Sequence, residues 1–382
     1  MRASKQHSIL ILSFTDHKRD PRVYRQINAL SDSYRLTTAG IGSGVLQFAE
    51  HIELSRKKNL FDIVLTAISL KLGFYEVRYW RQKIVNLAFD KLQDRNFDVI
   101  FANDLETLPL ALKLSKKLRA KIIFDAHEYE PRVMDDQFIF NFFFAKYYDY
   151  LCERYLSQAD YITTVSDGIA DEYKKNYKVD STVVFNAPIF QRLSPTNLDS
   201  DSIKIIHHGI INRSRKLENM IMLVGQILGS GYQLDLMLIN TDRKYMQFLK
   251  KCAGAYSNIR FLDPVQMPEI VNTINQYDIG MFLLPKDNFN HYWALPNKFF
   301  EFIQARLAVA VWPSPEMKRI VEQEKIGIVS EDFSIESMAI ALKSLTKEKI
   351  EEYKKNADVA AKKYNADVCA DQIREIVKGL LS

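Results

Sequence analysis

Cysteine is scarce in this 382-residue chain, and long apolar runs are missing. The three cysteines, Cys152, Cys252 and Cys369, are scattered, odd in number and without metal-type spacing, which predicts a reducing compartment. No apolar run is long enough to span a bilayer. Ser8–Phe14 is apolar but too short for a signal-peptide core, and polar residues follow it directly, so we expect a strand there.

The sequence also lacks a basic run interleaved with aromatic residues, which argues against a nucleic-acid partner. Its charge is close to balance, at a formal +5 with a pI near 8.8. This mild basicity suits an anionic small molecule or an anionic membrane surface. A hydrophobic fraction of 47% in a chain of this length predicts two packed domains.

Short apolar runs alternate with amphipathic helical stretches along the whole chain, which predicts an α/β fold with mostly parallel sheets. Between Asn186 and Ser202 the composition changes to Pro, Ser, Asn, Asp and Thr, so we expect an interdomain linker there. Strands are expected at 9–14, 36–40, 52–54, 99–102, 122–124, 161–165, 182–185, 203–209, 234–239, 259–261, 279–284, 307–311 and 326–329.

The stretch from His291 to Arg306 organises the second half of the chain. Pro296 and Asn297 make a break followed by a good N-cap residue, so we expect a helix starting at Lys298. Lys298 and Glu301 share a face of that helix. A cation for phosphate beside a carboxylate for a diol suits a sugar nucleotide, while a solvated Lys–Glu pair on an ordinary helix is the alternative interpretation.

A second group of polar residues follows two expected strands of the first half. One strand ends at Asn103 and Asp104, and the next leads into His127 and Glu128. In open parallel sheets, ligands bind outside the carboxyl ends of the strands, so we expect Asp104, His127 and Glu128 in one crevice. A satisfied structural histidine is the alternative interpretation of His127.

Two groups of basic residues are candidate anion sites. Arg22 and Arg25 lie on one face near the start of the helix that follows the first strand, where they either meet an anion or are solvated. Arg213, Arg215 and Lys216 precede a helix expected from Leu217, where basic side chains and free N–H groups can share an anion. A solvated basic turn is the alternative.

Two stretches combine aromatic residues with basic or apolar neighbours. In the helical region Asn59–Leu92, Arg78, Arg81 and Lys83 stand beside Tyr79 and Trp80. A dense aromatic run follows later, at Phe138–Phe144. Such surfaces can bind a membrane or an amphipathic acceptor, and a core helix with a basic outer face is the alternative, and more ordinary, interpretation of the first stretch.

Taken in order, these segments resemble the GT-B glycosyltransferases, specifically the retaining group 1 type, glycosyltransferase family 4. The resemblance runs nearly end to end, and the order and spacing of its pieces are more specific than any one piece. The matching segments are Asn103-Asp104 with Leu108-Pro109, Asp125-Ala-His-Glu128, His208-Gly209 with Arg215-Lys-Leu-Glu218, and Leu295-Pro-Asn-Lys-Phe-Phe-Glu301.

The resemblance implies two Rossmann-like, doubly wound domains facing across a cleft, with a C-terminal helix, residues 366–382, returning to the first domain. Residues 1–190 would bind the acceptor and residues 191–365 the nucleotide sugar. The implied reaction moves a sugar from a UDP- or GDP-sugar to a glycan or lipid-linked acceptor, with retention, in cell-surface polysaccharide or glycoconjugate synthesis. The enzyme would work in the cytoplasm, at the inner face of the membrane, without a metal or other cofactor.

Two other functions remain open at this stage. One is an epimerase or hydrolase of sugar nucleotides with the same fold. The other is a catalytically silent subunit of a glycan-assembly complex.

The resemblance also implies roles for individual residues. Glu301 would take the ribose hydroxyls, and Arg215, with Arg213 or Lys216, would neutralise the diphosphate. The remaining donor-side residues would be Gly209, Asn297 and Lys298. His127 and Asp104 would be the catalytic pair beside the transferred sugar, and the acceptor side would include Arg22, Asn103 and Glu128.

The chain departs from the family pattern at three places. Trp293 stands where a second Glu is frequent, eight positions before Glu301. Lys216 replaces the Gly of the phosphate turn, and no Gly-rich turn follows the first strand. These departures bear on the donor contacts.

Overall fold

The computed structural model describes residues 7–45, 49–55, 60–198 and 202–382. Asn59, expected to open a helical region, and residues 199–201 of the expected linker lie outside this part. The chain divides into two compact units. The first contains Met1–Phe185, Asn288–Asn290 and Cys369–Ser382, and the second contains Asn186–Asp287 and His291–Val368.

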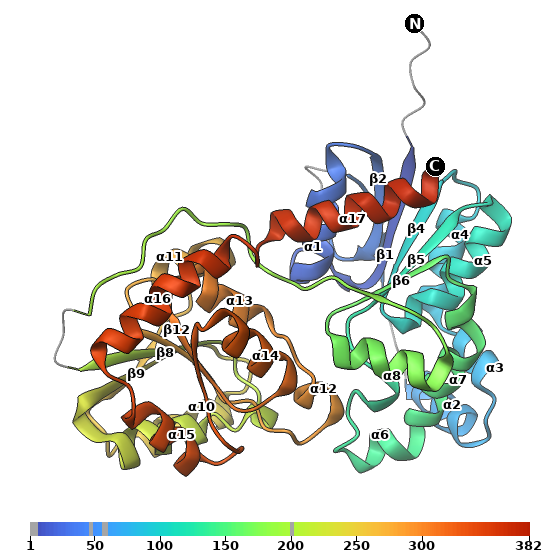
Figure 1. Ribbon diagram of the computed structural model, residues 1–382. Helices are drawn as coiled ribbons and strands as arrows, with labels where there is room; N and C mark the ends of the chain where they lie inside the picture. The colour runs from blue at the N-terminus through green and yellow to red at the C-terminus, as the bar shows by residue number, and fades with distance from the viewer. Residues whose placement is uncertain (1–6, 46–48, 56–59, 199–201) are drawn as a thin grey trace, which may run out of the picture. The chain divides into compact units, whose positions relative to one another are not determined.

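The first unit is built on a parallel sheet with the strand order β3-β2-β1-β4-β5-β6-β7 in the described residues. Figure 1 labels β1, β2, β4, β5 and β6 of this sheet. The strands are β1 (Ser8–Asp16), β2 (Arg35–Ile41), β3 (Glu50–Leu54), β4 (Val99–Asn103), β5 (Lys121–Ala126), β6 (Tyr161–Thr164) and β7 (Thr182–Val183). Every residue of β4 is buried, which is the pattern of a strand covered on both faces. The strand order reverses between β1 and β4, and ligands of doubly wound sheets bind at such a point.

Helices lie between successive strands of this unit in the sequence. They are α1 (Pro21–Ser31), α2 (Leu60–Lys71), α3 (Tyr75–Trp80), α4 (Lys83–Leu92), α5 (Leu108–Leu118), α6 (Phe138–Phe143), α7 (Ala145–Tyr155) and α8 (Asp167–Tyr177). The helical region expected up to Leu92 is therefore three helices. Gly73, whose φ of 74° lies in the left-handed region that favours glycine, stands in the first break, between α2 and α3.

The start of α1 shows why it begins where it does. Asp20 caps the helix by accepting hydrogen bonds from the N–H groups of Arg22 and Val23. Pro21 occupies the first helical position, where its missing N–H costs nothing. This cap fixes where Arg22 enters the interior of the unit.

The last helix, α17 (Ala366–Leu381), packs beside α1 in the first unit (Figure 1). Arg374 Nε donates to the carbonyl oxygen of Ala29 at 2.8 Å, and Cys369 Sγ lies 3.0 Å from the carbonyl oxygen of Phe185. Ile373 and Val377 are buried. The predicted return of the C-terminal helix to the first domain is thus confirmed, together with the two-sheet α/β fold class.

The second unit has a parallel sheet of order β10-β9-β8-β11-β12-β13 in the part of the chain that the structure describes. Its strands are β8 (Ile203–Ile210), β9 (Tyr232–Ile239), β10 (Ile259–Leu262), β11 (Ile279–Phe282), β12 (Ala308–Val311) and β13 (Gly327–Val329). The order reverses between β8 and β11, so this sheet has its own switch point.

The helices of the second unit surround a core of aliphatic residues from β8, β9 and β11. They are α9 (Glu218–Met222), α10 (Arg243–Ala253), α11 (Ile270–Ile274), α13 (Asn297–Gln304), α14 (Pro315–Glu324), α15 (Ile335–Lys343) and α16 (Lys347–Ala361). The short helix α12 (Phe289–Tyr292) and α17 each have residues in both units. None of the helices in the described residues has the length and apolarity needed to cross a bilayer.

Candidate functional site

The first group of site residues lies at the carboxyl end of the first sheet, next to its switch point. β4 ends at Asn103, and Asp104 follows at once with a φ of 65° and a ψ of 151°. β5 ends at Ala126, and His127 follows. The sequence prediction that Asp104 and His127 meet is confirmed, because Asp104 Oδ1 lies 3.1 Å from His127 Nδ1. We call Arg22, Asp104, Asp125 and His127 the first-unit cluster.

A buried ion pair between Arg22 and Asp125 forms the base of this cluster. Arg22 Nε donates to Asp125 Oδ2 at 2.5 Å, and Nη2 contacts the other carboxylate oxygen. Arg22 Nη1 donates to the carbonyl oxygen of Val184 at 2.7 Å. Arg22 was expected either to meet an anion or to be solvated, and the solvated interpretation is wrong, because the guanidinium is buried and meets the Asp125 carboxylate.

Asp125 receives further hydrogen bonds, from Gln26 Nε2 at 2.5 Å and from Thr163 Oγ1 at 2.6 Å. Burial by itself would raise the pKa of Asp125, but the charge and hydrogen bonds of Arg22 hold that pKa well below its usual range. Asp125 therefore stays ionised and presents a fixed negative charge to His127.

His127 lies between two carboxylates. Besides Asp104, it has Asp125 Oδ2 at 3.3 Å and Asn103 Oδ1 at 3.2 Å from Nε2. Burial would lower the pKa of His127, but the charges of Asp104 and Asp125 raise it to about 9. His127 is consequently an imidazolium at neutral pH, which donates hydrogen bonds and does not accept a proton as a general base.

The backbone at Asp104 is strained, because its φ and ψ fall in a region that is nearly reserved for glycine. The Asp104 carbonyl oxygen accepts hydrogen bonds from Thr107, whose hydroxyl lies 2.9 Å away. Burial raises the pKa of Asp104, although His127 acts in the opposite direction. Such strain recurs at functional sites, where the surrounding structure holds it in place.

Glu128 lies at the solvent side of the first-unit cluster. Crowding by protein atoms and the charge of Asp104 raise the pKa of Glu128 to about 7, although the residue keeps an exposed surface.

In the described part of the chain, no three His, Cys, Asp or Glu side chains are arranged to hold a metal ion.

The second group of site residues lies at the carboxyl end of β8, at the switch point of the second sheet. His207, His208 and Gly209 come from β8, and Lys298 and Glu301 come from α13. We call His207, His208, Lys298 and Glu301 the second-unit cluster. His208 Nε2 lies 3.4 Å from Glu301 Oε2.

Lys298 is buried beside two rings, those of His207 and Phe282. Its Nζ lies 3.3 Å from His207 Nε2 and 4.6 Å from the centroid of the Phe282 ring. Because His207 Nδ1 donates to the Met281 carbonyl oxygen at 3.0 Å, Nε2 is the unprotonated nitrogen and accepts from the ammonium. Gly209 has a φ of 119°, and a Cβ there would come within 3.2 Å of Lys298 Nζ, so glycine makes room for the ammonium.

The electrostatics of this cluster favour an anion. Burial and the charge of Arg215 lower the pKa of Lys298 well below its usual value, although Glu301 acts in the opposite direction. Burial and the charge of Lys298 also lower the pKa of His208, to about 3, so both histidines are neutral. A bound phosphate would supply the negative charge that the buried ammonium lacks.

The helix that carries Lys298 and Glu301 starts one residue earlier than expected. α13 begins at Asn297, and Pro296 is the N-cap residue without a side-chain hydrogen bond. The prediction that Asn297 caps the helix is therefore wrong; the Phe299 N–H instead donates to the Pro296 carbonyl oxygen at 3.0 Å. The solvated-pair alternative is wrong too, because Lys298 and Glu301 are both buried.

The basic turn after β8 separates its three cations. Arg215 is half-buried, its Nη1 donates to the carbonyl oxygen of Ile210 at 3.0 Å, and burial lowers its pKa. Arg213 pairs with Asp242 at 2.8 Å on the surface. Lys216 pairs with Asp287 at 2.8 Å and has a φ of 47°.

Only Arg215 of these three acts electrostatically on Lys298. The left-handed backbone of Lys216 explains why glycine is favoured at this position in the family that the sequence resembles. Trp293, at the position of the family's second Glu, packs edge-on against Tyr292 with 5.3 Å between ring centroids.

Sequence reasoning missed His207 and the role of Asp125. The signal for Asp125 was present, since an acidic residue follows directly on the apolar run Ile122–Phe124. His207 stands inside a strand whose neighbouring residues are buried, which marks a histidine that must find partners within the protein.

Comparison with known proteins agrees with this fold. Residues 44–187 match the family model of Glycosyltransferase Family 4. The chain is a glycosyltransferase of the GT-B fold. A search of curated protein sequences found no match for this glycosyltransferase.

Solved structures share the fold of this glycosyltransferase over nearly its whole length. HepE from Anabaena, solved with UDP-glucose, is 13% identical with a TM-score of 0.72, covering 97% of this chain and 99% of its own. Sucrose-phosphate synthase from Thermosynechococcus elongatus is 11% identical with a TM-score of 0.72, covering 98% and 99%. A UDP-forming α,α-trehalose-phosphate synthase from Burkholderia xenovorans is 12% identical with a TM-score of 0.68, covering 99% and 100%.

Proposed function

We propose that this glycosyltransferase transfers a sugar from a UDP-sugar to a glycan or lipid-linked acceptor with retention of configuration. The observation that carries the proposal is the burial of Lys298 between His207 and Gly209, with Arg215 nearby and a lowered pKa. A diphosphate is the ligand whose charge best compensates such a site. UDP is the proposed donor nucleotide, because HepE was solved with UDP-glucose and the trehalose-phosphate synthase is UDP-forming.

Glu301 is the proposed ligand of the ribose. Its carboxylate lies one helical turn from Lys298, on the same face of α13, so phosphate and diol sites are adjacent. His208 is neutral because its pKa is lowered to about 3, so it adds no positive charge beside the Glu301 carboxylate. A carboxylate accepts two hydroxyl hydrogen bonds at once, which matches a vicinal diol.

Leaving-group stabilisation is the proposed source of catalysis. The nucleoside diphosphate gains negative charge as the glycosidic bond breaks, and Lys298 and Arg215 are cations whose pKa values are already lowered by burial. Preorganised positive charge of this kind stabilises the transition state without a metal ion. The attraction between the Lys298 ammonium and the leaving group strengthens as the negative charge develops, because burial has removed the water that would screen it.

His127 is the proposed anchor for the transferred sugar and the acceptor. An imidazolium held by Asp104 and Asp125 has a fixed orientation and donates hydrogen bonds. Holding reacting groups in register is catalytic because misalignment lowers the rate steeply. Asn103 and Glu128 border this anchor and would contact the acceptor.

Association with the inner face of the cytoplasmic membrane is part of the proposal. Large apolar side chains are exposed on or near α2, α3 and α6 of the first unit, namely Ile63, Val64, Ile68, Leu72, Phe74, Val77, Phe138, Ile139 and Phe142. Arg81 and Lys83 belong to the same part of the unit. Apolar groups combined with cations bind an anionic lipid surface.

The test of donor choice is a thermal-shift screen against UDP-, GDP- and ADP-sugars, because a bound donor raises apparent stability by mass action. A shift with the UDP-sugar alone is the expected result. Product analysis with and without an acceptor then separates transfer from epimerisation or hydrolysis, since only transfer needs the acceptor. A protein that binds no nucleotide sugar in this screen would refute the proposed function.

A further inference from the structure

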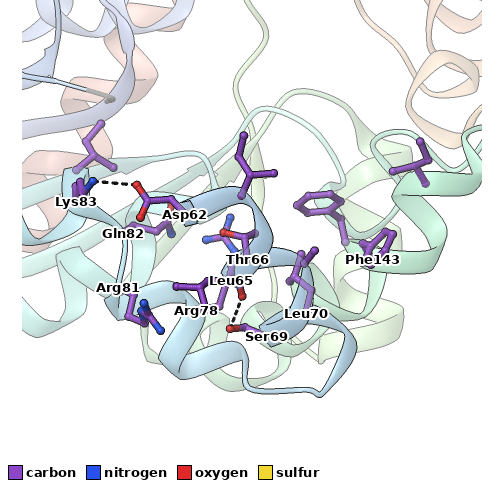
Figure 2. A pocket seen from close by; sticks show the side chains of 15 residues that line it. Asp62, Leu65, Thr66, Ser69, Leu70, Arg78, Arg81, Gln82, Lys83 and Phe143 are labelled. Carbon is purple, nitrogen blue, oxygen red and sulfur yellow. Dashed lines mark hydrogen bonds and ion pairs between the residues drawn. The ribbon is translucent and has the colours of Figure 1, made fainter. Parts of the chain in front are cut away.

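The first unit contains a pocket of about 520 Å³ that none of the first-unit cluster residues lines (Figure 2). It lies among α2, the segment joining α3 to α4, and α6. Its volume is within the range of small-molecule sites. Most of its wall is apolar and comes from Ile63, Leu65, Leu70, Ile84, Ile139 and Phe143.

One side of the pocket is basic and polar. Arg81, Gln82 and Lys83 come from one segment in Figure 2, and Phe143 of α6 lies apart from them. Lys83 pairs with Asp62 at 2.9 Å, the acidic residue of the lining. The lining keeps a net positive charge, because Arg78 and Arg81 add two further cations.

Two hydrogen-bond donors beside the pocket lack acceptors. The side chain of Arg78 is 8% exposed, and its Nε has no hydrogen-bond partner among the described residues. Arg78 Nη1 donates to the Tyr147 hydroxyl at 3.2 Å, and Nη2 lies 3.8 Å from Glu106. Gln82 Nε2 is also buried without an acceptor in the described structure. Buried donors without acceptors are costly, so both sites call for oxygen atoms of a ligand.

We infer that this pocket holds the aliphatic chain of a phosphate-bearing lipid, with phosphate oxygens taken by Arg78, Arg81 and Gln82. Apolar walls suit the chain, and donors with a net positive charge suit the phosphate. Ile63 and Ile139 line the pocket and are also exposed, by 55% and 67%, so the chain can pass from a bilayer into the pocket. The inference rests on the proposed function only where this lipid serves as the sugar acceptor.

A chain-length series of alkyl phosphates tests the pocket directly, by titration calorimetry on the full chain below micelle-forming concentrations. Each buried methylene should tighten binding about fourfold until the pocket is full, after which affinity should level off. Affinity that keeps rising with every added methylene would indicate unspecific partition and overturn the inference. An alkyl alcohol of equal length should bind at least tenfold more weakly, and equal binding would remove the phosphate from the site.

Two substitutions locate the site. Ala67→Trp places a large ring in the pocket lining and should abolish alkyl phosphate binding, while Ala341→Trp on α15 serves as the matched control. Gln82→Glu keeps the shape of the side chain but replaces a donor with a negative charge. This substitution should weaken binding of the alkyl phosphate by tenfold or more and leave binding of the alkyl alcohol unchanged. Binding that survives both substitutions in folded protein would place the ligand elsewhere.

The binding experiment and the transfer experiment test different statements, so either one can fail without the other. Transfer to a lipid phosphate acceptor that survives Ala67→Trp and Gln82→Glu unchanged would show that the lipid in the pocket is not the sugar acceptor, and would leave the proposed function intact. Alkyl phosphate binding without transfer to any lipid acceptor would leave the pocket intact and refute a lipid acceptor. A second copy of the chain as occupant would show as concentration-dependent dimers that alkyl phosphate does not dissociate, and this would also overturn the inference.

Discussion

The Lys298 ammonium lies 3.3 Å from His207 Nε2, so a neutral ring is the hydrogen-bond acceptor of a buried cation. Desolvation of a cation costs folding free energy, and a neutral acceptor returns only part of it. The second unit therefore carries a local instability that a bound anion would relieve.

Lys298→Met should raise the melting temperature of the ligand-free protein and weaken binding of UDP-sugar at least tenfold. Removing the desolvated charge should stabilise the fold by about 1–3 kcal/mol. Because the folded-state pKa of Lys298 is lowered, the wild-type protein should gain stability as pH rises toward the unfolded-state pKa, and the variant should lose this gain. Scanning calorimetry at several pH values checks this, with exposed Lys355→Met as the control. Equal donor affinity in wild type and Lys298→Met would contradict it.

His127→Ala should lower turnover about 10²-fold or more, because the reacting groups lose their alignment, while donor affinity changes less than twofold. Titration calorimetry and initial rates on one preparation separate these effects. The pKa of His127 is raised to about 9, so its stabilising contribution is complete below pH 6.5 and lost between pH 6.5 and 9. Wild-type turnover should show an alkaline limb near pH 9 that the variant lacks. If activity merely followed the folded fraction, His127 would be a structural residue.

Glu301→Gln should weaken donor binding by about 1.5–3 kcal/mol, because hydrogen bonds from the ribose to a charged acceptor are lost. The amide keeps the size of the side chain, so the melting temperature should change little. Titration calorimetry with UDP checks the affinity. A folded variant that binds UDP as tightly as wild type would remove Glu301 from the ribose site.

Gly209→Ala should reduce both stability and donor affinity. Its φ of 119° costs an alanine roughly 1–3 kcal/mol, and the added Cβ would lie within 3.2 Å of Lys298 Nζ. Gly229→Ala is the matched control, because Gly229 also has a positive φ but nothing lies within 4 Å of its Cβ position. Only Gly209→Ala should affect UDP binding in calorimetry, and an equal effect of both variants would refute the role of close approach.

Binding to anionic liposomes should occur at low salt and weaken as salt rises, because part of the attraction is electrostatic. Phe138→Ser should weaken flotation with the liposomes, since Phe138 is 80% exposed. Ile340→Ser on α15, with the native side chain 73% exposed, is the control and should leave flotation unchanged. A wild-type protein that stays wholly unbound at low salt would contradict membrane association.

The parts of this fold that depend on local pattern could be predicted from the sequence. Each expected strand overlaps an observed one, because buried parallel strands leave short apolar runs between helices. Asp104 and His127 could be brought together because both follow such strands and neighbouring strand ends meet at one edge.

Contacts between distant segments could not be predicted in the same way. Arg22 and Asp125 are 103 residues apart, and neither periodicity nor spacing shows that they pair. Pro296, and not Asn297, is the N-cap residue of α13. The preference of asparagine for the N-cap position is a local one, and the path of the chain into the helix overrides it here. The burial of Lys298 follows from β8 and β11 packing beside α13, which is a tertiary effect.

The return of α17 to the first unit has a consequence for biosynthesis. A ribosome makes Cys369–Ser382 only after the whole second unit, about 200 residues beyond Phe185. At bacterial or eukaryotic rates, this leaves α1 without its neighbour for on the order of 10–40 s. The nascent first unit thus carries an uncovered apolar strip during that interval, which is the kind of surface that chaperones recognise.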